Sequence, residues 1–327
     1  MDLSDFDYEL PQASIAQEPL ADRAASRMLV LYRDQQRWED HAFREFPNFL
    51  NPGDCLVLND SRVFPSRLYG HRLGMTGKVE VFLLRPISDD AKTWTALVHP
   101  GRKMRTGERI QFDGGLEAAI LARGEYGERT LRFSSEGDIY AAIDRIGHVP
   151  LPPYIQRPDT VLDRERYQTV FARERGSVAA PTAGLHFTPE ILEQCRAAIA
   201  KVTLHVGLGT FQPVRSETLH AEAFEVAAES EAKIRAASRV VCVGTTSVRA
   251  VESMALGRRG ETDLFIRPGF DFKLTGAMLT NFHLPESSLL MLVCAFAGRD
   301  LTLAAYRHAV TSGYRFYSYG DCMLVLR

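Results

Sequence analysis

The chain contains few cysteines, and no two of them are spaced as a C-x-x-C pair. They occur singly, at positions 55, 195, 242, 294 and 322, so the sequence indicates neither a zinc site nor disulfides. The longest uncharged apolar run, residues 289–297, is too short to cross a bilayer. The N-terminal segment MDLSDFDYELP is acidic and has no apolar signal-peptide stretch. These absences predict a cytoplasmic protein that holds no metal and enters no membrane.

Several motifs of nucleotide-binding and hydrolytic enzymes are also missing. Residues 207–210, GLGT, begin like a dinucleotide-binding loop, but Phe-Gln-Pro follows where the fingerprint requires a helix. A Walker A lysine loop, an H-E-x-x-H helix and a G-x-S-x-G nucleophile turn do not occur. The sequence therefore argues against a Rossmann NAD enzyme and against a hydrolase with a serine elbow.

What the chain does contain is an uneven distribution of charge. Its 327 residues carry a net charge of −2, and this length favours two domains over one. Residues 61–110 hold 10 Lys and Arg against 4 Asp and Glu, whereas residues 1–60 hold 5 against 12. A basic segment in a mildly acidic protein suits contact with a polyanion, although a solvated surface with chance clustering gives the same pattern.

The distribution of apolar residues predicts two kinds of structure. Between residues 63 and 149, short apolar or alternating runs break repeatedly at Gly or Pro, which is typical of a small antiparallel β-barrel. The proline-rich stretch 148–159 reads as a rigid connector. Residues 1–62 and 150–327 alternate strand-like and helix-like segments, with helices expected at 189–200, 229–238, 245–255 and 289–297. We predict an α/β domain with a largely parallel or mixed sheet, interrupted by an inserted barrel.

Polar groups precede three of the expected helices. Asn281 and His283 come before the apolar helix at 289–297, and His186 comes before the helix at 189. The positive end of a helix disfavours imidazolium, so we expect His283 to stay neutral. Gly244-Thr245-Thr246-Ser247 follows a strand and opens a helix, a geometry that binds carboxylate or phosphate. Ordinary loop closure and helix capping explain the same residues equally well.

Read together, eight segments of the chain resemble one known family closely. This family is the S-adenosylmethionine:tRNA ribosyltransferase-isomerases of queuosine biosynthesis, the QueA family. The segments occur in the family's order along the chain: LNDSRVFPSRLYG (58–70), GKVEVFLL (77–84), HVPLPPYI (148–155), AAPTAGLHFT (179–188), VTLHVGLGTFQPV (202–214), VGTTSVRAVE (243–252), TNFHLPESSLLMLVCAFAG (280–298) and YRFYSYGDCMLV (314–325).

The resemblance implies an α/β fold with an inserted barrel and a defined reaction. The enzyme would move and isomerise the ribosyl part of S-adenosylmethionine onto 7-aminomethyl-7-deazaguanine at the tRNA wobble position. The products would be epoxyqueuosine-tRNA, adenine and methionine. S-adenosylmethionine would be consumed as a substrate, so no cofactor and no metal are expected. The chain is shorter than the family pattern near residues 200, 219, 238 and 258.

Such chemistry needs a neutral base, an anchor for the methionine carboxylate and partners for positive charge. The candidate catalytic residues are His283, His186, His205, Asn281, Asp60 and Asp321, with His283 ranked first. The candidate substrate-binding residues are Thr245, Thr246, Ser247, Arg249, Gly207 and Gly209. His205 lies on a strand, where a lone histidine is more often a core residue than a catalyst.

The tRNA would be held by charge and read at a splayed base. The candidate phosphate contacts are Arg62, Arg67, Arg72, Arg102, Lys103 and Arg105. Phe316, Tyr317 and Tyr319 are candidates for base stacking, although a C-terminal aromatic cluster is more often core. Two other classes remain open: a conventional methyltransferase, which would form S-adenosylhomocysteine, and a non-catalytic RNA-binding module, which would not turn over S-adenosylmethionine.

Overall fold

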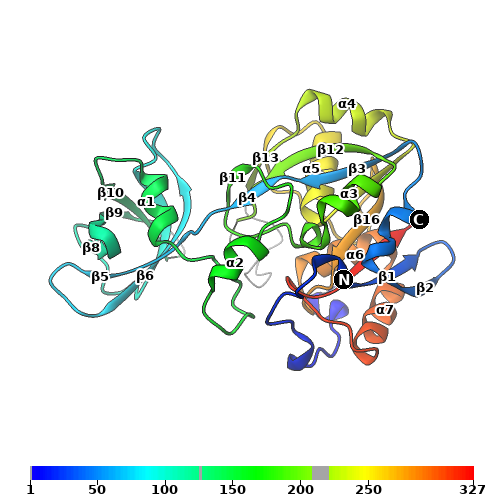
Figure 1. The fold of residues 1–327 in the computed structure, drawn as a ribbon, viewed down its shortest axis with the longest axis horizontal. Helices are drawn as coiled ribbons and strands as arrows, with labels where there is room; N and C mark the ends of the chain where they lie inside the picture. Colours follow the sequence, from blue (N-terminus) through cyan, green and yellow to red (C-terminus); the bar gives the residue numbers. More distant parts are fainter. Residues whose placement is uncertain (1, 125–126, 208–220) are drawn as a thin grey trace.

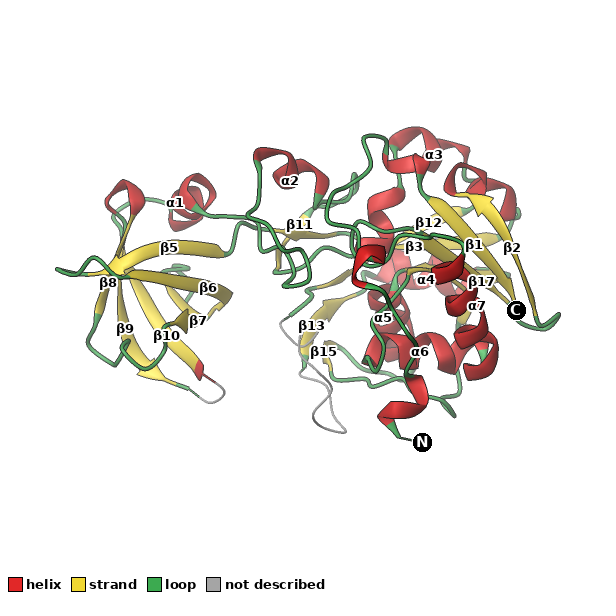
Figure 2. Ribbon diagram, turned by 90° about the horizontal axis from the view of Figure 1, so that it is seen from below, coloured by secondary structure: helices red, strands yellow, loops and turns green. Residues whose placement is uncertain are grey.

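The computed structural model describes residues 2–124, 127–207 and 221–327. A small β-barrel occupies one end of the molecule and a larger α/β part the other (Figures 1 and 2). Strands β4 (Ser61–Val63) and β11 (Glu174–Ser177) and helix α2 (Val161–Arg166) lie between them. The barrel strands fall within the sequence of the α/β part, so the predicted fold class is confirmed.

The α/β part is built on a mixed sheet in which the described residues form nine strands. The central strands β12, β3, β14 and β16 run parallel to one another, and β17 is antiparallel to β16. From one edge to the other the strands are β15 (Gly260–Thr262), β13 (Glu222–Glu225), β12 (Ala198–Leu204), β3 (Asp54–Asn59), β14 (Arg239–Val243), β16 (Thr275–Asn281), β17 (Cys322–Leu326), β1 (Arg27–Tyr32) and β2 (Arg37–Ala42).

Both faces of this sheet are covered, which explains its near-continuous apolar strands. Every residue of β3 is buried. Cys55 and Val57 pack against a first set of helices on one face of the sheet. Leu56 and Leu58 pack against a second set on the opposite face. The first set comprises α4 (Ala228–Ala236), α5 (Thr245–Ala255), α6 (Ser288–Ala297) and α7 (Arg299–Thr311), and the second comprises α3 (Pro189–Gln194), η4 (Phe43–Phe49) and η7 (Thr182–His186).

The inserted barrel is closed by six antiparallel strands and has its own core. In β6 (Lys78–Pro86) the alternate residues Val79, Val81 and Leu83 are buried inside it, as the alternation in the sequence predicts. Helix α1 (Ile139–Ile146) covers the barrel through Ile139 and Ile143. The strands run in the order β10 (Glu128–Ser134), β7 (Thr93–His99), β6 (Lys78–Pro86), β5 (Arg67–Arg72), β8 (Arg109–Phe112) and β9 (Glu117–Arg123).

The helix expected at residues 189–200 is shorter than predicted. Helix α3 ends at Gln194, and β12 begins at Ala198. Residues 198–202 pair in parallel with residues 55–59 of β3. This segment is therefore a strand, although its local sequence favours helix. The remaining turns include the short 3-10 helices η1 (Leu3–Phe6), η2 (Gln12–Ser14), η3 (Arg23–Ala25) and η5 (Asp113–Gly115).

No single helix in the part of the chain that the structure describes is long and apolar enough to cross a membrane. Helices α6 and α7 meet the length and composition requirement only as a pair, bent by 116° at their junction.

Sheet topology brings several loops to one edge. The carboxyl ends of β3, β14 and β16 lie together because these strands are parallel. Because β17 and β1 run the opposite way to β16, their amino ends reach the same edge. The segments after Asn59, Val243 and Asn281 therefore meet the segments before Arg27 and Cys322.

Candidate active site

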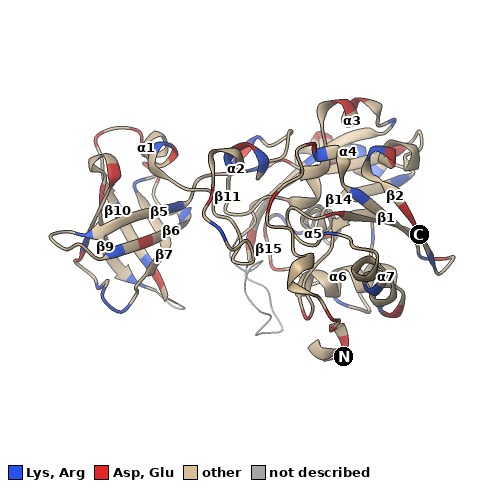
Figure 3. Cartoon of the chain, turned by 60° about the horizontal axis from the view of Figure 1, so that its bottom comes forward, with Lys and Arg blue, Asp and Glu red and all other residues tan. Residues whose placement is uncertain are grey.

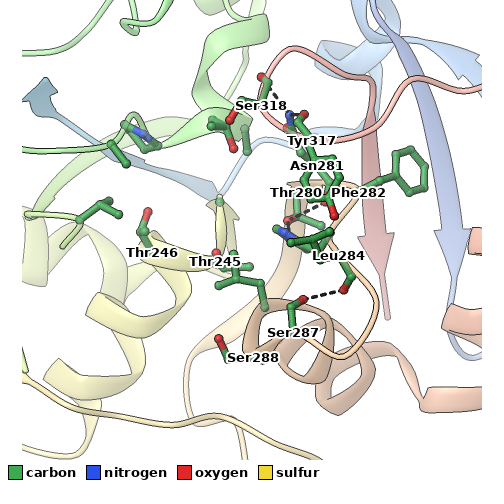
Figure 4. A pocket seen from close by; sticks show the side chains of 18 of the residues that line it. Thr245, Thr246, Thr280, Asn281, Phe282, Leu284, Ser287, Ser288, Tyr317 and Ser318 are labelled. Carbon is green, nitrogen blue, oxygen red and sulfur yellow. Dashed lines mark hydrogen bonds between the residues drawn. The ribbon is translucent and has the colours of Figure 1, made fainter. Parts of the chain in front are cut away.

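A cavity of about 320 Å³ opens at this edge of the sheet (Figure 4). Its walls are the turn at residues 179–183, the start of α5, the segment between β16 and α6, and the loop before β17. Figure 4 shows Thr245 and Thr246 on one side and Asn281 and Tyr317 on the other. Among the lining residues Glu286 carries the one acidic side chain, and no Lys or Arg lines the described wall.

The start of α5 lines the cavity through Gly244, Thr245 and Thr246. Gly244 links β14 to this helix with φ of 88°, a conformation that side-chain-bearing residues rarely adopt. Its N–H donates to the Leu279 carbonyl at 2.7 Å, which ties the turn to β16. Thr246 receives a hydrogen bond from the Asn59 side-chain amide at 3.2 Å. The turn is therefore held by the two neighbouring parallel strands.

Two members of the same sequence motif face away from the cavity. The Ser247 hydroxyl donates to the Val243 carbonyl at 2.7 Å, and the residue is fully buried. Arg249 is buried beside the sheet edge, where it forms an ion pair with Glu222 and donates to the Leu264 carbonyl at 3.1 Å. Both side chains thus stabilise the fold in this structure, and within this motif only Gly244, Thr245 and Thr246 line the cavity.

Gly207 does not line the cavity either. Its N–H donates to the second carboxylate oxygen of Glu222 at 2.8 Å, so this glutamate joins α5 to the end of the β12 segment. Gly209 lies outside the described residues, as do residues 208–220 generally.

His283 lines the cavity with a buried imidazole. Its Nε2 lies 2.7 Å from the Thr280 hydroxyl oxygen, and that hydroxyl reaches the Asn281 carbonyl at 3.3 Å. If the hydroxyl donates to the carbonyl, Nε2 donates to the hydroxyl, and the lone pair remains on Nδ1. Burial lowers the pKa of His283 to about 3, so the ring is neutral at physiological pH. The cause is desolvation. The expected effect of the helix start does not apply, because α6 begins only at Ser288, five residues after His283.

Two buried tyrosines fix the backbone of His283. The Tyr8 hydroxyl donates to the His283 carbonyl, and the His283 N–H donates to the Tyr306 hydroxyl at 3.2 Å. Tyr8 comes from the N-terminal segment and Tyr306 from α7, so parts of the chain far apart in sequence hold the ring in place.

Asn281 and His186 belong to one chain of hydrogen bonds. The Asn281 amide donates to the Tyr317 carbonyl at 2.8 Å, so its oxygen is free to accept from His186 Nε2 at 3.0 Å. His186 Nδ1 then accepts from the Ser26 hydroxyl at 2.8 Å. Burial lowers the pKa of His186 as well. Asn281 reaches the cavity, whereas His186 lies behind it and supports it.

The remaining catalytic candidates lie elsewhere. Asp60 accepts from the Thr203 hydroxyl at 2.7 Å. Asp321 accepts from the backbone N–H groups of Arg27 and Arg315 at 2.9 and 2.8 Å, which closes the loop before β17. His205 lines a separate cavity of about 460 Å³ beside β13, and burial lowers its pKa. None of these three side chains lines the cavity around His283.

Sequence reasoning missed most of the aromatic wall. Tyr317 and Tyr154 stack with ring centroids 4.4 Å apart, and the Tyr154 hydroxyl lies 2.7 Å from the Ser318 hydroxyl. Tyr317 has φ of 71°, a strained value for a bulky residue. Its neighbours Phe316 and Tyr319 pack into the core instead, and Tyr319 donates to Asp163 at 2.7 Å. Tyr154 belongs to the HVPLPPYI segment of the family resemblance, but it lies 163 positions before Tyr317, and nothing local in the sequence pairs the two rings.

The basic candidates divide into paired and unpaired groups. Arg67 forms an ion pair with Glu80 at 3.1 Å, and Arg72 is paired with Glu108. The others, Arg62, Arg102, Lys103 and Arg105, are exposed, and none has a carboxylate partner among the described residues. Figure 3 shows that basic positions are interspersed with acidic ones over the barrel and the α/β part alike.

Comparisons with known proteins agree on one family. Residues 3–325 match the family model described as queuosine biosynthesis protein. The chain is 65% identical to the S-adenosylmethionine:tRNA ribosyltransferase-isomerase of Solibacter usitatus and 48% identical to that of Desulforamulus reducens, with both chains covered completely in each case. The first alignment spans 352 positions against 327 residues here, so that relative has residues that this chain lacks.

A solved structure gives the same answer. The crystal structure of the S-adenosylmethionine tRNA ribosyltransferase of Thermotoga maritima is 41% identical, with a TM-score of 0.57 over 98% of this chain and 100% of that one. The fold, the order of the motifs and these full-length matches lead to one conclusion. This chain belongs to the queuosine biosynthesis family of S-adenosylmethionine:tRNA ribosyltransferase-isomerases.

Proposed function

We propose that this protein transfers and isomerises the ribosyl moiety of S-adenosylmethionine onto 7-aminomethyl-7-deazaguanine at the wobble position of tRNA. The products are epoxyqueuosine-tRNA, adenine and methionine, and the reaction takes place in the cytoplasm. The observation that supports this function best is the charge of the cavity. Its lining combines tyrosine rings with one carboxylate, Glu286, and no described cation. S-adenosylmethionine carries a net positive charge and suits such a lining.

His283 serves as the base in this proposal. The carbon beside the sulfonium is acidified by the positive charge, and an imidazole with a free Nδ1 accepts its proton. Because the pKa of His283 is about 3 in the unliganded protein, the ring is always unprotonated at working pH but is a weak base. The adjacent sulfonium therefore supplies the driving force by acidifying the carbon rather than by raising the basicity of the ring.

The start of α5 holds the methionine carboxylate. Thr245 and Thr246 line the cavity opposite Tyr317, and the first N–H groups of an 11-residue helix favour an anion. This arrangement separates the carboxylate at one wall from the nucleoside at the other. Asn281 orients the wall beside His283 through its bond to the Tyr317 carbonyl.

The tRNA is held by the unpaired cations. Arg102, Lys103 and Arg105 in the β7–β8 connection, together with Arg62, remain available because no described carboxylate neutralises them. Arg67 and Arg72 already satisfy Glu80 and Glu108 and contribute less.

Product analysis tests the proposed function. Purified protein is incubated with S-adenosylmethionine and with tRNA that carries 7-aminomethyl-7-deazaguanine or, as a control, unmodified guanine. We expect adenine and methionine to form only with the first tRNA. Formation of S-adenosylhomocysteine would instead show a methyltransferase, and tRNA binding without either product would show a non-catalytic RNA-binding protein.

A further inference from the structure

A second cavity, of about 310 Å³, lies where the barrel joins the α/β part. We call it the junction groove and define it by Arg62 on β4, Arg164 on α2, Arg175 on β11, and the neighbouring Asp144, Tyr167 and Gln168. Figures 1 and 2 show β11 and α2 between the two parts of the molecule. Three arginines from three separate elements thus converge on one groove.

The acidic side chains of the groove are already neutralised. Asp163, at its floor, accepts two hydrogen bonds from the Arg157 guanidinium at 2.7 and 2.9 Å. Asp144 accepts from Arg175 Nη1 at 2.8 Å. Neither carboxylate is paired with Arg62 or Arg164.

Arg62 and Arg164 have no carboxylate partner among the described residues, and Arg175, which is paired with Asp144, retains unused donors. Arg164 donates to the carbonyls of Asp144 and Gly147, at 2.9 and 2.5 Å, so its position is fixed but its charge is not balanced. Arg62 is exposed and has no carboxylate partner among the described residues. Arg175 has its guanidinium against the Tyr140 ring, 4.7 Å from the centroid, and its Nε and Nη2 have no partner in the described chain. Guanidinium groups with unbalanced charge or unused donors favour a phosphate oxygen.

The groove and the active-site cavity share a wall. Tyr167 lines both, and only 1% of its surface is exposed. Tyr167 is therefore a wall common to the groove and the cavity. A nucleotide that enters the cavity from a single-stranded loop must leave its adjacent backbone close outside.

We propose that the junction groove binds a backbone phosphate of the tRNA beside the nucleotide being modified, through Arg62 and Arg164. This inference rests on the proposed function, because it takes tRNA as the substrate. It assigns the RNA contact nearest the chemistry to the junction, in addition to the β7–β8 connection of the barrel.

Single and double variants test this site. Arg62→Ala, Arg164→Ala and the double variant are compared with Arg258→Ala, which removes a partly exposed arginine paired with Asp263 in the turn after α5. We expect each groove variant to raise the KM for tRNA, with the affinity for S-adenosylmethionine unchanged. The logarithm of the tRNA binding constant falls as the logarithm of the salt concentration rises, and each lost phosphate contact should make this slope shallower by about 0.7–0.9. Arg62→Lys should keep most of the binding.

The measurements separate failure of this site from failure of the proposed function. Direct tRNA binding by titration needs no turnover, so it reports on the groove even if the wild type releases no adenine. A folded double variant with the wild-type salt slope and tRNA affinity would overturn the proposal. Arg164 also donates to the Gly147 carbonyl, so the melting temperature of each Arg164 variant is measured as well. Arg62 is exposed, so Arg62→Ala is the variant least coupled to folding.

Discussion

His283 owes its neutral state to burial, and this distinction could not be made from the sequence. The sequence identifies a histidine before an apolar helix, which suggests an effect of the helix dipole. The structure places the ring next to Thr280, five residues before α6 begins, where desolvation lowers the pKa to about 3. Residue types in a motif are thus visible in one sequence, whereas the direction of each side chain is decided by neighbours distant along the chain.

Arg249 shows the same limit most clearly. In the sequence it lies one turn into the helix that opens at Gly244, and an anion-binding role is natural. In the structure its guanidinium is committed to Glu222, which in turn binds the Gly207 N–H. Glu222 lies 27 positions earlier, on β13, so no local sequence pattern predicts this ion pair.

Substitution of Arg249 should therefore affect stability rather than ligand binding. Arg249→Ala leaves a buried carboxylate unpaired, and we expect a loss of about 3–5 kcal/mol in the free energy of unfolding. Urea unfolding measures this loss, and calorimetry on the folded fraction should give wild-type affinity for S-adenosylmethionine. An Arg249→Ala variant of wild-type stability with weakened binding of S-adenosylmethionine would show instead that the guanidinium contacts the substrate.

At the scale of elements, the sequence predicts best where the pattern is local. Alternating apolar residues define the barrel strands, and the continuous apolar run at 289–297 defines a buried helix. The prediction failed at residues 198–200, where pairing with β3 overrides a helix-like composition. The junction of β14 and α5 was predicted correctly from Gly244-Thr245-Thr246 because a strand, a glycine and a helix start are all local signals.

Gly244 offers a test of how this junction serves the site. An alanine there meets only ordinary contacts, with Thr246 Oγ1 at 3.6 Å and Ala183 Cβ at 3.7 Å, but it must adopt φ of 88°. We expect Gly244→Ala to destabilise the protein by about 1–3 kcal/mol, because φ of 88° with ψ of 153° is a region that essentially only glycine occupies. We also expect it to weaken S-adenosylmethionine binding as the start of α5 shifts. Gly257→Ala, at a positive φ of 80° in the turn after the same helix, is the control for backbone strain outside the cavity. Equal affinity for S-adenosylmethionine in both variants would show that the start of α5 does not bind this substrate.

Three histidines, of which His186 and His283 are buried and His205 is partly buried, make the stability of the whole molecule depend on pH. Burial lowers the pKa of His186, His205 and His283 in the folded state. Below about pH 6.5 the unfolded chain therefore binds protons that the folded chain excludes. Stability is fully present above that pH and is lost as the pH falls, for His283 down to its folded pKa of about 3.

This dependence can be measured by urea unfolding between pH 7.5 and 4.5. Each fully excluded histidine should contribute a slope of up to about 1.4 kcal/mol per pH unit. His283→Gln should flatten the profile, while the surface variant Arg258→Ala should not. A free energy of unfolding that stays constant across this range would contradict the burial of these rings.

The overall architecture and the family were both accessible from the sequence, because motifs spread over the whole chain keep their order. The active-site cavity was not, since Tyr154, Tyr317 and Glu286 meet only through the fold. The central claim is that His283 in this cavity removes the proton that starts ribosyl transfer.

The most direct measurement is single-turnover adenine release by wild-type protein and by His283→Gln, with S-adenosylmethionine and tRNA bearing 7-aminomethyl-7-deazaguanine. Glutamine fills similar space and can hydrogen-bond to Thr280, but it cannot accept a proton at this pH. We predict a rate lower by about 10²–10⁴ in a variant that stays folded and binds S-adenosylmethionine normally. Adenine release at the wild-type rate from such a variant would contradict the claim.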